Sequence, residues 1–168
     1  MRKILDALYD SAAALAALFM IGLLVMVLLS IAGRQLHFNL PGSDAYAGYL
    51  MAGAGFLALA HTLKRGEHIR VTLILSHLGL RAHRWMERWA MGAAAALSVL
   101  FAFFSVRLVL QSHEYHDIST GNDATALWIP QLSMAIGTVV LAIAAIDEFV
   151  LEWRGRVRVV PEEAVRHE

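Results

Sequence analysis

Four long apolar runs dominate the pattern of hydrophobic and polar positions along the chain. The first, Ser11–Gly33, has 23 residues and no charge among them. As a helix rising about 1.5 Å per residue it would be roughly 34 Å long, which matches a hydrocarbon core of about 30 Å. The other three runs are Ala45–Leu63, Trp89–Val106 and Leu127–Ile146. The pattern therefore predicts an all-α polytopic membrane protein with four transmembrane helices.

Helix-start and helix-breaking residues set the predicted limits of these spans. Pro41 and Gly42 break the chain before the second run, and Asp44 suits the positive end of a helix dipole. Pro130 lies near the start of the fourth run, where its missing N–H is harmless. We expect one transmembrane domain over 1–154, followed by a disordered tail over 155–168. Its expected spans cover about 11–33, 44–63, 89–107 and 127–147.

The connection between the second and third runs is too polar to span a membrane and too apolar to be an ordinary loop. Over about 69–84, apolar residues recur at three- and four-residue spacing, and Arg70, His77 and Arg81 fall mostly on the opposite face. The pattern predicts an amphipathic helix on the cytoplasmic side. It leaves open whether this helix lies on the membrane surface or on the protein itself.

Small residues gather in the second run. Gly53 and Gly55 lie among alanines there, a composition that allows helices in a membrane to approach closely. We expect this segment to pack tightly, either inside the bundle or against another subunit.

The basic residues predict the orientation, because lysine and arginine are retained on the cytoplasmic side. Twelve of the 14 basic residues precede the first run, lie between the second and third, or follow the fourth. The other two, Arg34 and Arg107, flank loops that carry Asp44, Asp117 and Asp123. Both termini are therefore expected in the cytoplasm.

Composition narrows the classes of function. Hydrophobic residues make up 58% of the chain and charged residues 17%, against about 25% charged in soluble domains. The formal net charge of zero gives no reason to expect a nucleic-acid partner. The absence of cysteine excludes disulfides, thiolate metal sites and cysteine nucleophiles.

Two histidine patterns raise the question of a cofactor. The cluster His113–Asp117 has two histidines three residues apart, whereas zinc proteases space them by four with a glutamate after the first. A haem needs two facing axial ligands, and only His61 lies within an expected span. We therefore expect no metal, no cofactor and no enzymatic activity, and interpret the chain as an accessory subunit. A cytochrome b-type anchor subunit and a channel or enzyme that acts alone remain the alternatives.

The segment Gly66-Glu67-His68-Ile69-Arg70-Val71, together with Leu127-Trp128-Ile129-Pro130-Gln131, resembles the small membrane subunit of tripartite ATP-independent periplasmic (TRAP) transporters. The four-span layout with both ends inside fits this family over nearly the whole chain. The family often has a glutamate where this chain has Asp44. The small subunit of tripartite tricarboxylate transporters has a similar topology and is the near alternative.

The resemblance implies a scaffold in a secondary transporter of the bacterial inner membrane. A periplasmic binding protein would deliver an organic anion, such as a carboxylate, and a large membrane subunit would import it with an ion gradient. The expected partners are that large subunit, the binding protein and the phospholipid bilayer. The residues expected at structural or partner contacts are Asp44, Gly66, Glu67, His68, Arg70, Trp128 and Pro130.

Overall fold

The computed structural model describes residues 2–38, 40–65 and 80–153, and four helices account for most of them. Their bounds are α1 Arg2–Leu36, α2 Ser43–Arg65, α4 Leu80–Glu114 and α5 Trp128–Trp153. No strand occurs among the described residues, where one isolated bridge joins Ile118 and Ala126. The predicted all-α fold is confirmed.

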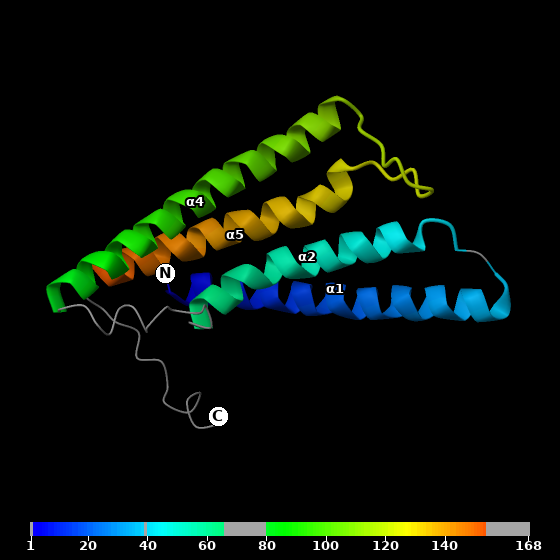
Figure 1. Ribbon diagram of the computed structural model, residues 1–168. Helices are drawn as coiled ribbons and strands as arrows, with labels where there is room; N and C mark the ends of the chain where they lie inside the picture. The colour runs from blue at the N-terminus through cyan, green and yellow to red at the C-terminus, as the bar shows by residue number, and fades with distance from the viewer. Residues whose placement is uncertain (1, 39, 66–79, 154–168) are drawn as a thin grey trace, which may run out of the picture.

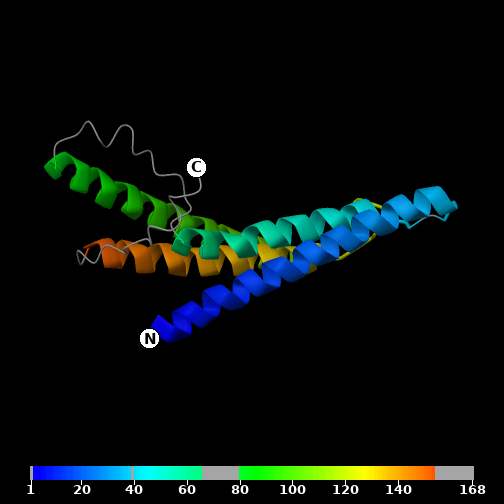
Figure 2. The same cartoon turned by 90° about the horizontal axis from the view of Figure 1, so that it is seen from below.

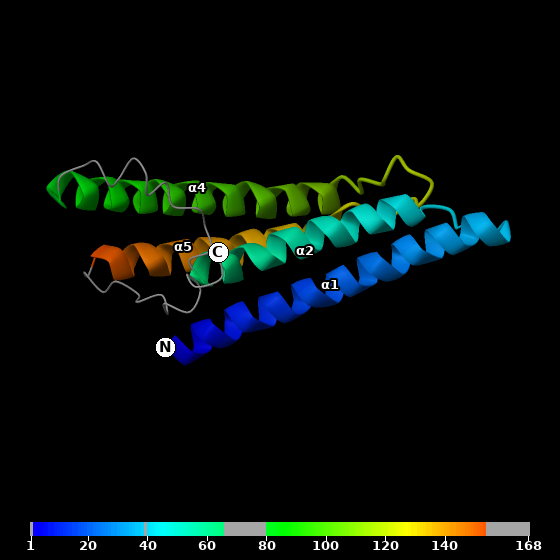
Figure 3. The ribbon, with the colours of Figure 1, turned by 60° about the horizontal axis from the view of Figure 1, so that its bottom comes forward.

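The helices lie side by side in the spatial order α1, α2, α5, α4 (Figures 1 and 3). The extensive contacts are α1 with α2, α2 with α5, and α4 with α5, so α1 and α4 flank the group. Figure 2 shows α1 running obliquely to α5. We call the end at which α1 begins and α5 finishes the terminal end. The opposite end, where segments 37–42 and 115–127 connect the helices, is the loop end.

Three helices are long and apolar enough to cross a membrane: Leu5–Leu36, Arg88–Glu114 and Trp128–Leu151. The chain is an all-α polytopic membrane protein. Helix α2 has 23 residues but is less apolar, because glycine, alanine and His61 replace larger aliphatic side chains. It lies between two of these spans, α1 and α5.

Helices α1, α4 and α5 extend well beyond the predicted spans. Helix α1 begins nine residues before Ser11, and α4 continues seven residues past Arg107. Residues 80–84, predicted to end a separate interfacial helix, belong instead to the same continuous helix as the third span. No proline or glycine interrupts the sequence between 80 and 91, so nothing breaks the backbone hydrogen bonding there. The rest of the predicted interfacial helix, 69–79, and the tail 155–168 lie outside the described residues.

Two helices end at the loop end with a histidine in the left-handed conformation. His37 has a φ of 57° and His116 a φ of 54°. After each, the next backbone N–H returns to the carbonyl five residues back, Phe38 to Gly33 and Asp117 to Ser112, at 3.0 Å in both cases. This is the Schellman arrangement, which satisfies helix carbonyls that would otherwise lack a partner.

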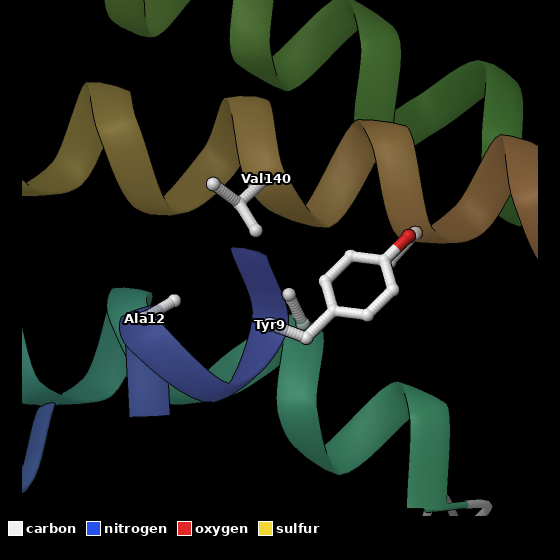
Figure 4. Close-up of a cluster of buried hydrophobic side chains, with 5 residues drawn as sticks. Tyr9, Ala12 and Val140 are labelled. Atoms are coloured by element: carbon white, nitrogen blue, oxygen red, sulfur yellow. The ribbon is translucent and has the colours of Figure 1, made fainter. Parts of the chain in front are cut away.

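The core at the terminal end joins α1, α2 and α5 (Figure 4). Tyr9 and Ala12 of α1 pack with Ala60 of α2 and with Val140 and Ala144 of α5, and all five are buried. Three of them are alanines, so the backbones approach closely around one large tyrosine ring. Small residues at contacts are typical of helices that associate in membranes, where van der Waals packing replaces the hydrophobic effect.

Two glycines set the closest helix approaches. A Cβ on Gly137 of α5 would lie 2.5 Å from the backbone carbonyl of Phe56 in α2. A Cβ on Gly53 would clash with the Phe19 ring of α1. The predicted packing role is therefore confirmed for Gly53. Gly55 is exposed and has open space around it, so it does not pack inside the bundle, and its packing against another subunit stays a prediction.

Helix α4 packs on α5 through a narrow stripe. Its buried residues are Ala95, Ala102, Ser105, Val109 and Ser112. These recur at spacings of three, four and seven, which is the seam pattern of helices packed at a small crossing angle. Outside the stripe, most residues of α4 between 94 and 110 are exposed.

Candidate functional site

Helix α4 presents a broad apolar surface to a partner. Helix α4 makes its extensive contacts with α5 alone, so most of its circumference is exposed. Its exposed large apolar side chains in the spanning region are Leu97, Val99, Leu100, Phe101, Phe103, Phe104, Val106, Leu108 and Leu110. In a membrane such a surface contacts lipid or another membrane protein.

Phenylalanines give part of this surface a defined shape. Phe103 and Phe104 are in edge-to-face contact with ring centres 5.5 Å apart, and they are 60% and 52% exposed. The ring centre of Phe101 lies 5.9 Å from that of Phe56 in α2, so one side of Phe101 contacts the bundle. We call Phe103 and Phe104 the α4 aromatic patch. Aromatic residues are enriched at protein interfaces.

A polar cluster joins α1 to α2 at the terminal end, and we call it the terminal cluster. Lys64 Nζ lies 2.7 Å from Asp6 Oδ1 and 5.3 Å from the centre of the Tyr9 ring. One turn deeper, His61 Nδ1 lies 3.8 Å from Asp10 Oδ1. The apolar pattern does not predict this cluster, because Asp6, Tyr9 and Asp10 precede the uncharged run that starts at Ser11. The available signal was the spacing of Asp6, Tyr9 and Asp10, which places all three on one helical face.

The second polar cluster lies at the loop end and holds the two helical hairpins together. Asp123 accepts a hydrogen bond of 3.0 Å from the Tyr49 hydroxyl and one of 2.8 Å from the Ser119 hydroxyl. Thr125 donates to the hydroxyl of Tyr46 at 3.2 Å. We call these five residues the loop cluster. Its bonds connect α2 to the segment between α4 and α5.

The loop cluster keeps Asp123 ionised. Hydrogen bonding from Ser119, and in smaller part from Thr125 and Tyr49, lowers the pKa of Asp123 from 3.8 to about 2. Gly42 lets the segment before α2 pack closely against Asp123, because a Cβ there would lie 2.7 Å from Asp123 Cβ. Its φ of 81° also favours glycine.

Comparison with known protein families decides what kind of protein carries this architecture. Residues 23–155 match the model of the tripartite ATP-independent periplasmic transporters, DctQ component. The chain belongs to this family. The match covers α1 from residue 23 to its end and all of α2, α4 and α5, so the TRAP resemblance inferred from the sequence is confirmed. No curated protein matches the chain in a sequence comparison.

Members of the DctQ family are components of transporters. Among the described residues, no group of three His, Asp or Glu side chains could hold a metal. The His113 ring instead packs edge-on against Trp128 at 5.3 Å, and His116 Nδ1 lies 3.1 Å from the Glu114 carbonyl oxygen. Nδ1 of His61, the histidine considered for haem, lies 3.8 Å from Asp10 Oδ1.

The structure places three of the predicted contact residues of this DctQ-family chain at the loop end. Asp44 is exposed in the first turn of α2. Trp128 begins α5 and packs against α4, and Pro130 lines a cavity between helices. The loop end thus brings them near one another without making them a single site. The other four, Gly66, Glu67, His68 and Arg70, lie outside the described residues.

Proposed function

We propose that this chain is the small membrane scaffold subunit of a TRAP-type secondary transporter. In this role it binds a large transmembrane subunit and holds it in the bilayer. The complex imports an organic anion, a carboxylate, which a periplasmic binding protein delivers and an ion gradient drives. The family match over 23–155 carries the proposal.

The character of the buried residues supports a scaffold over a pathway for ions or substrate. Ionisable side chains that serve transport are usually buried within the membrane, facing the bundle interior. Among the described residues, the buried polar side chains are Ser105, Ser112 and Thr138, and none is charged. The transport step would therefore belong to the large subunit.

We propose that all four helices span the bacterial inner membrane with both termini in the cytoplasm. Lys64 and Arg88 lie at the terminal end, together with Arg2 at the start of α1. The acidic residues Asp117 and Asp123 lie at the loop end. This distribution follows the retention of basic residues in the cytoplasm and supports a periplasmic loop end.

The chain has no cysteine, so single cysteines can test this orientation without background. In intact cells a membrane-impermeant maleimide should label Thr120→Cys, at an exposed position in the loop, and should not label Lys3→Cys. After the cells are broken, both should react. Labelling of Lys3→Cys in intact cells would contradict the proposed orientation and place the N-terminus in the periplasm.

The α4 aromatic patch is our candidate contact for the large subunit. Affinity purification of the chain from native membranes in mild detergent, followed by mass spectrometry, should recover a much larger polytopic protein. Phe103→Ala with Phe104→Ala should weaken binding of the large subunit by about a hundredfold and so reduce that recovery, since aromatic anchors often contribute about 1.4 kcal/mol or more each. The matched control is Leu18→Ala with Leu24→Ala on the exposed side of α1. Purification of the wild-type chain without a partner, under conditions that preserve other complexes, would exclude the scaffold function.

Two further contacts follow from the sequence pattern. We propose that Gly66, Glu67, His68 and Arg70 organise the cytoplasmic junction after α2, and that the loop end, with Asp44, contacts the binding protein. Arg70→Ala should reduce assembly with the large subunit. Charge reversal at Asp44 and Asp117 should lower the uptake rate while leaving assembly intact. Unchanged assembly in the first case, or unchanged uptake in the second, would remove that contact from the proposal.

A further inference from the structure

A cavity of about 510 Å³ opens between α1, α2 and α5 toward the loop end. Phe19 and Met26 of α1, Leu50 of α2 and Pro130 of α5 form apolar parts of its lining. The Phe19 ring rests on Gly53, where no side chain intervenes, at the end of the cavity further from the loops. From Phe19 to Met26 the cavity follows two turns of α1, about 10 Å. The cavity therefore runs lengthwise along the helices.

The polar groups of the cavity lie mainly at its loop end. Tyr46 and Thr125 line the opening there, and their hydroxyls are hydrogen-bonded to each other at 3.2 Å. Because the cavity lies along membrane-spanning helices, hydrocarbon rather than water surrounds its apolar length. The molecule that matches this cavity is an amphiphile. Its hydrocarbon chain would lie along the helices, and its polar headgroup would lie at the loop end.

The charged residues near the opening indicate which kind of headgroup the cavity accepts. The lining contains no Lys, Arg, Asp or Glu side chain, but Tyr49, which lines the cavity, donates to the Asp123 carboxylate. The loop 115–127 that carries Asp123 contains neither lysine nor arginine. The nearest arginines in sequence, Arg34 and Arg107, lie on α1 and α4 outside the lining. The opening thus favours a cationic group over an anionic one.

We propose that this cavity binds one acyl chain of a phospholipid with an ammonium headgroup, with the headgroup held beside Tyr46, Thr125 and Asp123. The lipid fills the gap between α1 and α5, which make few contacts with each other, and so completes the packing around α2. This inference does not depend on the scaffold function, because it uses contacts within this chain alone.

The test uses the full chain, purified in mild detergent and equilibrated with an equimolar mixture of phosphatidylethanolamine and phosphatidylglycerol. Native mass spectrometry then counts the lipids that remain bound after detergent removal. The wild-type chain should retain one phosphatidylethanolamine in preference to phosphatidylglycerol. Retention of neither lipid, or equal retention of both, would overturn the proposal.

A pair of methionines on α1 provides the cavity variant and its control. Met26→Trp places an indole in the cavity, and displacing about two methylene groups of the chain should reduce lipid retention about tenfold. Met20→Trp makes the same change at a position that is 55% exposed outside the cavity, and it should retain lipid as the wild type does. Equal retention by both variants would mean that lipid binds elsewhere on the surface. If Met26→Trp loses its helical circular dichroism, Met26→Phe makes the same comparison with a smaller ring.

A second pair of variants tests the headgroup preference. Asp123→Asn should abolish the preference for phosphatidylethanolamine while the cavity still accepts an acyl chain. Asp117→Asn, at an exposed position in the same loop, should leave the preference unchanged. A preference that survives Asp123→Asn would rule out Asp123 as the recognising group.

Discussion

The Tyr49 hydroxyl donates a hydrogen bond to Asp123 Oδ2 at 3.0 Å, across 74 positions of the sequence. Tyr49 belongs to the α1–α2 hairpin and Asp123 to the connection between α4 and α5. The bond therefore fastens the two hairpins at the end where their helices do not share the alanine core.

Removal of this bond should loosen the loop end. Tyr49→Phe keeps the ring and removes only the donor, so we expect a decrease of about 2 °C in the midpoint of thermal unfolding in detergent. Circular dichroism at about 222 nm measures it. Tyr115→Phe, at a tyrosine that is 69% exposed, should leave the midpoint unchanged. Equal midpoints for Tyr49→Phe and the wild type would mean that the bond contributes nothing to stability.

The loop cluster should also make stability depend on acid. The pKa of Asp123 is lowered to about 2 in the folded chain, from 3.8. A carboxyl with a lowered pKa stabilises the fold above its unfolded pKa and loses that contribution as the pH falls toward the folded value. We therefore expect the unfolding midpoint to fall between about pH 4 and pH 2.

Asp123→Asn should flatten this decrease, because an amide does not titrate in that range. Its midpoint should already be lower than that of the wild type at neutral pH. Asp117→Asn should keep the wild-type profile. An identical acid profile for Asp123→Asn and the wild type would show that other carboxyls cause the decrease.

Close packing of α2 on α5 gives a sharper prediction. Gly137→Ala forces a methyl group into the backbone of Phe56, where the Cβ would be 2.5 Å from the carbonyl. Overpacking of this kind costs about 1–3 kcal/mol. The same change at Gly55 meets open space, so only the better helix propensity of alanine acts there, up to about 1 kcal/mol in favour of folding. Chemical unfolding in mixed micelles should separate the two variants, and destabilisation of equal size would contradict the observed approach.

The contrast between Gly55 and Gly137 also shows how far the sequence could predict the fold. Uncharged runs such as Ser11–Gly33 indicate spans, because a charged side chain that faces lipid is costly in any fold. They do not indicate where a helix ends, since backbone hydrogen bonding continues into polar residues. Helix α1 accordingly starts at Arg2, nine residues before its apolar run. Which glycine contacts a neighbour depends on helix rotation, which small-residue composition does not specify.

The loop end was harder to predict for another reason. Its main bond joins Tyr49 to Asp123, and no local pattern relates residues so far apart. The helix ends at His37 and His116 carry no glycine, the usual signal for a left-handed residue after a helix. Asp44, Trp128 and Pro130 were predicted as contacts and do lie near this end, but the cluster that organises it centres on Asp123.

The terminal cluster allows a test of how α1 and α2 are paired. Lys64 contacts Asp6 at 2.7 Å and is the less exposed partner, at 21% against 47%. Asp6→Lys alone and Lys64→Asp alone should each place like charges together and destabilise the chain by about 0.2–1 kcal/mol, the range of partly exposed pairs. The double variant should recover most of that loss because it restores opposite charges in the same register. A double-mutant cycle by chemical unfolding measures the coupling, and its size should fall at high salt. Losses that simply add in the double variant would show that the two side chains do not interact, and would argue for a different register between α1 and α2.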